Sequence, residues 1–202
     1  MKTLYFAYGS NLSLAQMAVR CPGSKLLGTA VLPGFRWQIN QRHYANVVQT
    51  AGADMSSSTS ADGQQGGVAG LVYELAGPGD EAALDRAEGY HGVLFREAHP
   101  LLADRDVAWI VNQGGPAAVL AAAGSVPVEQ DPTAASRMDG VLVYLSRFYT
   151  EEGSPYEEYI GRLGRGIADS IALGVDRDFF RRCFLPYAPE LEKETDAVSR
   201  SE

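Results

Sequence analysis

The sequence predicts a single α+β domain built around a mixed, largely antiparallel sheet. Short apolar runs rich in β-branched and aromatic residues fill the first three quarters of the chain, and apolar residues at helical spacing follow Pro155. Strands first and helices last is an order typical of α+β domains rather than of doubly wound ones. The 202 residues are 46% hydrophobic, enough for one core. We therefore expect one domain over residues 1–189 and a polar, disordered tail over residues 190–202.

Turn-forming residues predict where the strands and helices of the first third of the chain begin and end. A buried strand over residues 4–8 should end at Gly9-Ser10-Asn11, and Ser13 is of the residue type that caps a helix, here over residues 14–20. Residues 50–67 are rich in Ser, Gly and Ala without periodicity, which predicts a long exposed loop. Between these segments lie three strand-like runs, at residues 25–32, 35–40 and 45–49.

The rest of the chain alternates strands and helices. The run VAGLVYEL at residues 68–75 predicts a buried strand, and Asp80 as cap with Gly89 as stop predicts a helix over residues 81–88. Residues 95–102 and 107–112 have the pattern of a β-hairpin, and residues 114–137 carry no assignable pattern. A buried strand over residues 140–145 and helices after Pro155 and near Asp176 complete the prediction.

Composition argues against several classes of function. The formal net charge is −8 and no Lys/Arg cluster occurs, which disfavours nucleic acid and anionic membranes as partners. Two scattered cysteines, Cys21 and Cys183, suit a reducing cytoplasm, and the N-terminus lacks the pattern of a signal peptide. The three histidines show no ligand spacing, so we expect no metal site. A small molecule is the expected partner, and the sequence leaves a homodimer open.

The first segment whose residues suit binding or catalysis is the turn that follows the first strand. A Gly-Ser-Asn turn presents consecutive backbone N–H groups and small polar side chains at one point, which can hold a carboxylate or stabilise an oxyanion. An ordinary strand-to-helix turn would show the same residues, because Gly, Ser and Asn are common turn formers. On the pattern alone, both interpretations stand.

The second such segment is the end of the helix predicted over residues 81–88. Glu88 falls in its last turn, where unpaired carbonyl groups repel a carboxylate. Apolar neighbours such as Tyr90 and Leu94 would add desolvation, and both effects would raise the pKa of Glu88 toward the range of a general base. The alternative is an exposed glutamate paired with a nearby arginine.

Several segments together resemble the γ-glutamylcyclotransferase family. The run YFAYGSNL at residues 5–12 is similar to the family signature, and LDRAEG at residues 84–89 resembles the segment that bears its catalytic glutamate. The match keeps the family order over residues 4–174. Three more segments carry it, namely VAGLVYEL at residues 68–75, VYL at residues 143–145 and the Pro155-x-x-x-Tyr159 stretch.

The resemblance implies a barrel-like β fold flanked by helices and the cyclisation of a γ-glutamyl group to 5-oxoproline, without a cofactor. Glu88 would be the general acid and base, beneath a cavity lined by the 9–12 loop. The substrate-binding residues that the resemblance implies are Tyr8, Gly9, Ser10, Asn11, Leu12, Tyr144 and Tyr159.

The sequence also departs from the family and leaves rival functions open. Residues 50–67 and 114–137 look longer than a compact member needs, so the leaving amine is not defined. The signature YGSNL argues against the glutathione-specific and the γ-glutamylamine branches. The rivals are a hydrolase with Ser10 as its nucleophile, a binding module without activity, and a cyclotransferase that acts on a biosynthetic intermediate.

Overall fold

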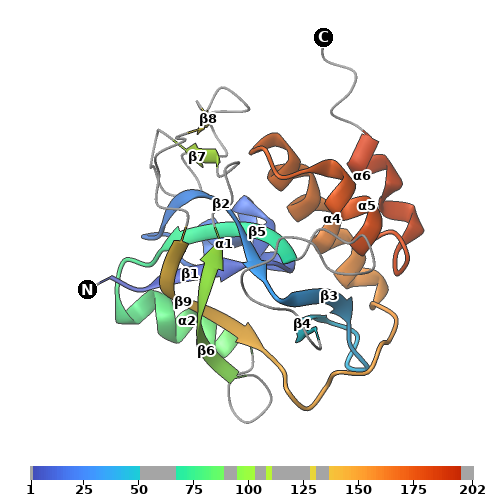
Figure 1. Ribbon diagram of the computed structural model, residues 1–202, viewed down its shortest axis with the longest axis horizontal. Helices are drawn as coiled ribbons and strands as arrows, with labels where there is room; N and C mark the ends of the chain where they lie inside the picture. The colour runs from blue at the N-terminus through green and yellow to red at the C-terminus, as the bar shows by residue number, and fades with distance from the viewer. Residues whose placement is uncertain are drawn as a thin grey trace.

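The chain folds around a seven-stranded sheet. The computed structural model describes residues 2–50, 67–88, 95–102, 108–110, 128–130 and 137–196. The order of the sheet is β5-β1-β9-β6-β2-β7-β8, and a separate two-stranded sheet joins β3 to β4 (Figure 1). The strands are β1 Leu4–Ala7, β2 Lys25–Pro33, β3 Phe35–Ile39, β4 Ala45–Gln49, β5 Gly67–Glu74, β6 Phe95–Leu102, β7 Ala108–Ile110, β8 Val128–Gln130 and β9 Arg137–Leu145.

Five of these strands pair in a circuit. β5 pairs with both β1 and β2, β2 pairs with β6, β6 with β9, and β9 returns to β1. Among the pairings of the described residues, β1–β9 alone is parallel. Gly70 permits the close approach of β5 to β1, because a Cβ at this position would lie 2.2 Å from the Ala7 carbonyl oxygen. The prediction of a mixed, largely antiparallel and barrel-like sheet is therefore confirmed.

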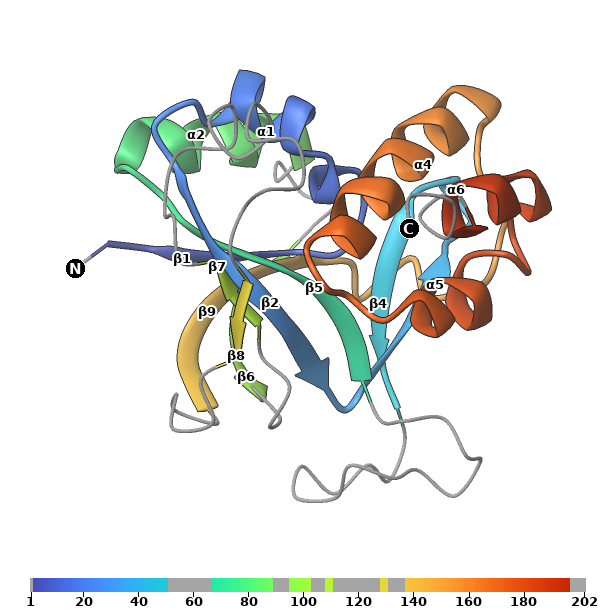
Figure 2. The ribbon, with the colours of Figure 1, turned by 90° about the horizontal axis from the view of Figure 1, so that it is seen from above.

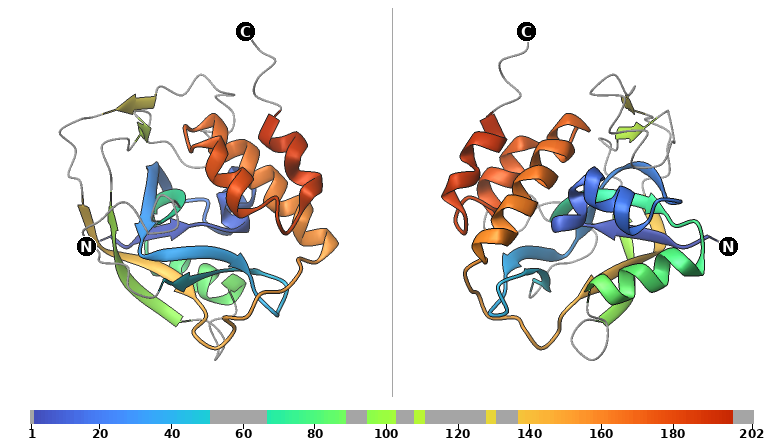
Figure 3. Two further views of the ribbon diagram at one scale, coloured as in Figure 1. Left: turned by 45° about the vertical axis from the view of Figure 1, so that its right-hand side comes forward. Right: turned by 180° about the vertical axis from the view of Figure 1, so that it is seen from behind.

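The helices cover the sheet in two groups. α1 (Leu14–Arg20) neighbours α2 (Pro78–Glu88), and α4 (Glu157–Ala172), α5 (Arg177–Cys183) and α6 (Glu192–Asp196) form a second layer (Figure 2). Figure 3 shows the same helical layer standing beside the strands from two further sides. No helix in the described ranges is long and apolar enough to cross a membrane.

α4 closes the core where the chain returns to the N-terminal turn. Its apolar positions at helical spacing, Tyr159, Leu163 and Ile167, are all buried, and each such burial contributes about 1.5–3 kcal/mol. Gly166 lets the helix press against Leu12, because a Cβ at residue 166 would lie 2.8 Å from the Leu12 Cβ. The sequence thus fixes α4 directly beside the 9–12 loop.

Two predictions about elements were wrong. β6 and β7 occupy the predicted strands, but β6 pairs with β9 and β2, and β7 pairs with β8 and β2, so the predicted hairpin is absent from the described residues. Residues 190–196 are not a disordered tail but form the end of η2 (Pro189–Leu191) and α6. Leu191 is 2% exposed and Thr195 is fully buried. This segment therefore packs against the core, which its polar composition did not indicate.

Several sequence predictions fall outside the described residues. They concern most of the 50–67 loop, most of the unassigned 114–137 stretch, and the apolar neighbours Tyr90 and Leu94. The last six residues of the tail also lie outside them.

Candidate functional site

The turn after β1 is a single 3-10 turn, η1 (Ser10–Leu12). The N–H of Leu12 donates to the Gly9 carbonyl at 3.0 Å, and that of Ser13 donates to the Ser10 carbonyl at 3.1 Å. A side chain at residue 9 would not fit easily, since a Cβ would lie 3.1 Å from the Tyr159 hydroxyl oxygen and 3.2 Å from the Ala45 Cβ. An alanine here would require Tyr159 or Ala45 to shift by a few tenths of an ångström.

Two backbone N–H groups of this turn have no acceptor within the described part of the chain, those of Gly9 and Ser10. The first amides of any helical turn lack a partner in the turn itself, and ligands often supply one. Ser10 is 8% exposed, so these donors lie in a region with little water. They suit an oxygen atom that carries negative charge.

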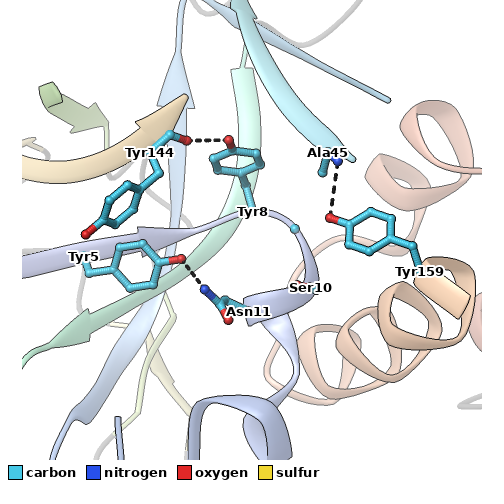
Figure 4. Close-up of a pocket in the computed structure, with 8 residues that line it drawn as sticks. Tyr5, Tyr8, Ser10, Asn11, Ala45, Tyr144 and Tyr159 are labelled. Atoms are coloured by element: carbon cyan, nitrogen blue, oxygen red, sulfur yellow. Dashed lines mark hydrogen bonds between the residues drawn. The ribbon is translucent and has the colours of Figure 1, made fainter. Parts of the chain in front are cut away.

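The turn forms one wall of a pocket of about 300 Å³, part of it open to solvent. In Figure 4, Tyr5 and Tyr144 lie together on one side of Tyr8 and Ser10, and Tyr159 reaches in from α4 on the other. Residues from β1, η1, β4, β9 and α4 line the pocket: Tyr5, Tyr8, Gly9, Ser10, Asn11, Ala45, Tyr144 and Tyr159.

Most residues that the resemblance implied are brought together here, but Leu12 is not. Six of them, Tyr8, Gly9, Ser10, Asn11, Tyr144 and Tyr159, line the pocket. Leu12 is absent from its lining, is fully buried, and lies against Gly166 of α4. The Leu12 side chain is therefore part of the core, and the expectation that the backbone of residues 9–12 holds the substrate stays a prediction.

Sequence reasoning missed two lining residues. Tyr5 lies in a strand buried along most of its length, so no alternation of polar and apolar residues marks it out. Ala45 contributes a small side chain and a backbone N–H, which donates to the Tyr159 hydroxyl at 3.3 Å. Neither type of contribution leaves a signal in a single sequence.

Hydrogen bonds fix the tyrosine side chains of the pocket. The Tyr8 hydroxyl donates to the Tyr144 carbonyl oxygen at 2.5 Å, and the Asn11 side-chain amide donates to the Tyr5 hydroxyl at 2.8 Å (Figure 4). Tyr5 also packs edge-on against Tyr144, with ring centroids 5.9 Å apart. The side chains of Tyr5 and Tyr8 are thus held by partners within the protein.

Asn11 is oriented from behind by residues of α1. Its Oδ1 atom accepts from the Gln16 side-chain amide at 2.9 Å and from the Arg20 guanidinium at 2.7 Å. The same Gln16 amide donates to the Ser10 hydroxyl at 2.9 Å. The positively charged Arg20 therefore contacts the lining residue Asn11 from the side of α1.

On the α2 side, the acidic residue Asp85 contacts the lining residue Tyr144. The Tyr144 hydroxyl donates to Oδ1 of Asp85 at 2.6 Å. Asp85 lies three residues before Glu88, which is the last residue of α2. The structure thus places the backbone of the predicted catalytic residue on the helix that contacts the pocket, while the Glu88 side chain lies outside what it describes.

A half-buried carboxylate joins α4 to the base of the turn. Oδ2 of Asp169 accepts from the Leu14 N–H at 2.8 Å, which ties the first residue of α1 to α4. Burial raises the pKa of Asp169 above its ordinary value, although the Leu14 bond and the charge of Arg165 both act to lower it. The turn is therefore supported on its far side by α4.

Comparison with solved structures identifies proteins of the same fold. An uncharacterised protein from Homo sapiens superposes with a TM-score of 0.54 at 17% identity, over 96% of this chain and 87% of that one. A protein described as a γ-glutamyl cyclotransferase superposes with a TM-score of 0.52 at 18% identity, over 97% of this chain and 88% of that one. The sequence matches no family model and no curated protein. At these identities the likeness shows the fold alone.

Proposed function

We propose that this chain is a γ-glutamyl cyclotransferase, which cyclises a γ-glutamyl group to 5-oxoproline and releases a free amine. The observation that carries the proposal is the pair of N–H groups, of Gly9 and Ser10, that have no acceptor among the described residues and lie in the wall of a tyrosine-rich pocket. The signature at residues 5–12, the LDRAEG segment and the shared fold support the same assignment.

The reaction is intramolecular. The α-amine nitrogen attacks the γ-carbonyl carbon, a C–N bond forms, and the bond from that carbon to the leaving nitrogen breaks. One proton leaves the attacking nitrogen and one joins the departing nitrogen, so no water is consumed. Holding the glutamyl chain folded supplies proximity worth roughly 7–11 kcal/mol in favourable cases.

Gly9 and Ser10 would stabilise the oxygen of the tetrahedral intermediate through their N–H groups. Such donors act most strongly where the charge develops and water is excluded. The rigid backing of the turn by α4 keeps these donors in place without reorganisation. Removal of one comparable donor costs about 10²–10³ in rate in other enzymes.

Glu88 would carry the proton between the two nitrogens. Positions three apart share one face of a helix, so residues 85 and 88 lie on the same face of α2, and residue 85 contacts the pocket through Tyr144. General acid–base catalysis by a positioned side chain contributes about 10²–10⁴ in rate.

A hydrolase with Ser10 as nucleophile is less well supported. Such a serine needs a base within hydrogen-bond reach. Among the described residues the Ser10 hydroxyl is bonded to the Gln16 amide, which cannot accept a proton at neutral pH. The sequence around it, Gly9-Ser10-Asn11, also lacks the G-x-S-x-G pattern of a nucleophile elbow.

Product analysis separates the candidate functions. Purified protein is incubated with γ-glutamyl dipeptides, γ-glutamylamines and glutathione, and 5-oxoproline and glutamate are quantified by mass spectrometry. We expect 5-oxoproline and free amine in equal amounts from at least one member of the panel. Glutamate as the product would indicate a hydrolase instead. Binding of γ-glutamyl compounds without any product would indicate a binding module, or a cyclotransferase for a larger biosynthetic intermediate.

A further inference from the structure

The turn that joins β3 to β4 has a histidine where its backbone favours glycine. The His43 N–H donates to the Asn40 carbonyl at 2.8 Å, and the Asn40 N–H donates to the Tyr44 carbonyl at 2.9 Å, so the hairpin has a three-residue loop. His43 is the last residue of this loop, and among the described residues it is the one non-glycine with a positive φ, 70°. Glycine is preferred at such a position because a Cβ strains the left-handed conformation.

The His43 side chain contacts residues 151–156, the segment that leads into α4. Its Nδ1 atom lies 2.6 Å from the Ser154 carbonyl oxygen, and a carbonyl can only accept, so this nitrogen carries the proton. Its ring packs on that of Tyr156, the N-cap residue of α4, with ring centroids 4.3 Å apart. Glycine could make neither contact, and both favour histidine here in spite of the strain.

Backbone hydrogen bonds hold only the first half of the hairpin tip to this segment. The Gln41 N–H donates to the Glu151 carbonyl at 3.1 Å, and the Gly153 N–H donates to the Ile39 carbonyl at 2.9 Å. In the described part of the chain, no backbone hydrogen bond reaches the segment from residues 42–45. The second half of the tip is therefore joined to it through side chains.

The second half of the tip continues into the wall of the pocket. Ala45 follows His43 by two residues, and its N–H donates to the Tyr159 hydroxyl at 3.3 Å (Figure 4). Tyr159 lies three residues after Tyr156, on the same side of α4. The Tyr44 ring packs edge-on against both of these tyrosines, with centroids 5.8 Å from Tyr156 and 5.1 Å from Tyr159. The residues that His43 holds together are thus close neighbours of the two that meet in the pocket.

We infer that His43 is a positioning residue for the pocket, which holds the hairpin tip against the start of α4 so that the Ala45 N–H and the Tyr159 hydroxyl meet. The Tyr159 oxygen lies 3.1 Å from the position of a Cβ on Gly9, so a shift of Tyr159 changes the space beside η1. Residues that break a local rule are expected at functional sites, and His43 breaks the rule of its turn. The inference rests on the proposed function only for its effect on turnover.

Hydrogen exchange of the Ala45 amide, followed by NMR, measures this positioning without any ligand. His43→Gly suits the φ of the turn and removes both side-chain contacts. It should accelerate exchange of the Ala45 amide at least about threefold, the protection that one ordinary hydrogen bond gives. Tyr159→Phe, which removes the acceptor, should accelerate it equally. The Asn40 amide, which donates to the Tyr44 carbonyl, should keep its wild-type rate in both variants and so show that the hairpin is intact.

Turnover and stability complete the test. Relief of strain and loss of contacts oppose each other, so His43→Gly should shift the melting temperature by less than about 4 °C. With the best substrate of the γ-glutamyl panel, its kcat/KM should fall about tenfold or more, because misplacement of a pocket wall costs rate. If His43 acts through Tyr159, the double variant should show no further loss than Tyr159→Phe alone.

The neighbouring turn residue provides the matched control. The Arg42 guanidinium lies over the Tyr149 ring, 5.2 Å from its centroid, and not against the start of α4. Arg42→Ala should therefore keep the wild-type exchange rate of the Ala45 amide and the wild-type kcat/KM. Should His43→Gly fail to fold, His43→Asn replaces it, because asparagine also tolerates the left-handed conformation and lacks the ring.

Three results would overturn the inference. They are wild-type exchange of the Ala45 amide in His43→Gly, equal acceleration of the Ala45 and Asn40 amides, and faster exchange with an unchanged kcat/KM. The second result would show that His43 merely holds its own turn together. A wild-type protein that releases no 5-oxoproline from any substrate would refute the proposed function, whereas the exchange rates would still decide whether His43 positions Ala45 and Tyr159.

Discussion

Gly9 lies where three elements meet, and a methyl group there would contact its neighbours tightly. A Cβ at residue 9 would approach the Tyr159 hydroxyl and the Ala45 side chain to 3.1 and 3.2 Å. Gly9→Ala should therefore displace Tyr159, lower the free energy of unfolding by about 1–3 kcal/mol and reduce turnover. Urea denaturation and 5-oxoproline release check both effects.

A glycine in open space provides the matched control. A Cβ at Gly161, on the exposed side of α4, would meet no atom within 4 Å. Because alanine favours a helix over glycine, Gly161→Ala should raise the free energy of unfolding by about 0.5–1 kcal/mol. Equal effects of the two substitutions would show that Gly9 is not constrained by its neighbours.

At the level of single residues, the sequence identified the site residues that lie in family motifs and missed those that lie outside them. The YGSNL run located the turn and four of the lining residues, and two later segments that resemble the family added Tyr144 and Tyr159. It did not show that Leu12 turns under α4, because the motif records residue types and not side-chain directions. Tyr5 and Asp85 were missed as part of the site, since their roles arise from partners 6 and 59 residues away in the chain.

Among the elements, α4 supports the turn through Asp169. Its pKa is raised by burial, so the folded chain binds this proton more tightly than the unfolded chain. This contribution to stability is complete below the ordinary value of 3.8 and is lost as the pH rises through the raised pKa. Asparagine does not titrate, yet its carbonyl can still accept from the Leu14 N–H.

Asp169→Asn should therefore gain stability relative to the wild type as the pH rises from 4 to 7. Urea unfolding of both proteins at several pH values in this range measures the difference. A difference that does not change with pH, or one that favours the wild type more at pH 7, would contradict the raised pKa.

Strand pairing shows where local patterns stop being sufficient. Two strand-like runs that follow each other favour a hairpin, yet β6 pairs with β9 instead. Residues 141–145 of β9 are all buried, so this strand needs a partner on each side. β1 supplies one and β6 the other. The choice depends on packing between distant segments, which a local pattern does not record.

At the scale of the whole molecule, one core joins the strand circuit to both helical layers. Tyr73 of β5 is fully buried within it, and its hydroxyl has no hydrogen-bond partner among the described residues. An unpaired buried polar group costs roughly 1–3 kcal/mol. Tyr73→Phe removes only that oxygen, so it should leave the free energy of unfolding unchanged or raise it by up to about 1 kcal/mol.

Tyr8→Phe is the matched comparison, because it removes a hydroxyl that donates to the Tyr144 carbonyl. It should lower the free energy of unfolding by about 1 kcal/mol. Chemical denaturation of both variants tests the pair. A marked loss of stability in Tyr73→Phe would show that its hydroxyl has a partner in the folded protein.

The fold class was predictable because it follows from the order of strands and helices along the chain. Without the family resemblance the pocket was not predictable, because its walls come from five elements spread between Tyr5 and Tyr159. Their convergence depends on the parallel pairing of β1 with β9 and on the close packing of α4 at Gly166. Those contacts are non-local and leave no periodic signal.

The claim on which the proposed function depends most is the role of Glu88, and one substitution tests it directly. Glu88→Gln keeps the size of the side chain and removes its ability to carry a proton. With the best substrate of the γ-glutamyl panel, we expect it to release 5-oxoproline about 10²–10⁴ times more slowly than the wild type, with an unchanged melting temperature. Glu190→Gln, an exposed site beyond α5, should keep the full rate. Release by Glu88→Gln at the wild-type rate would contradict the assignment.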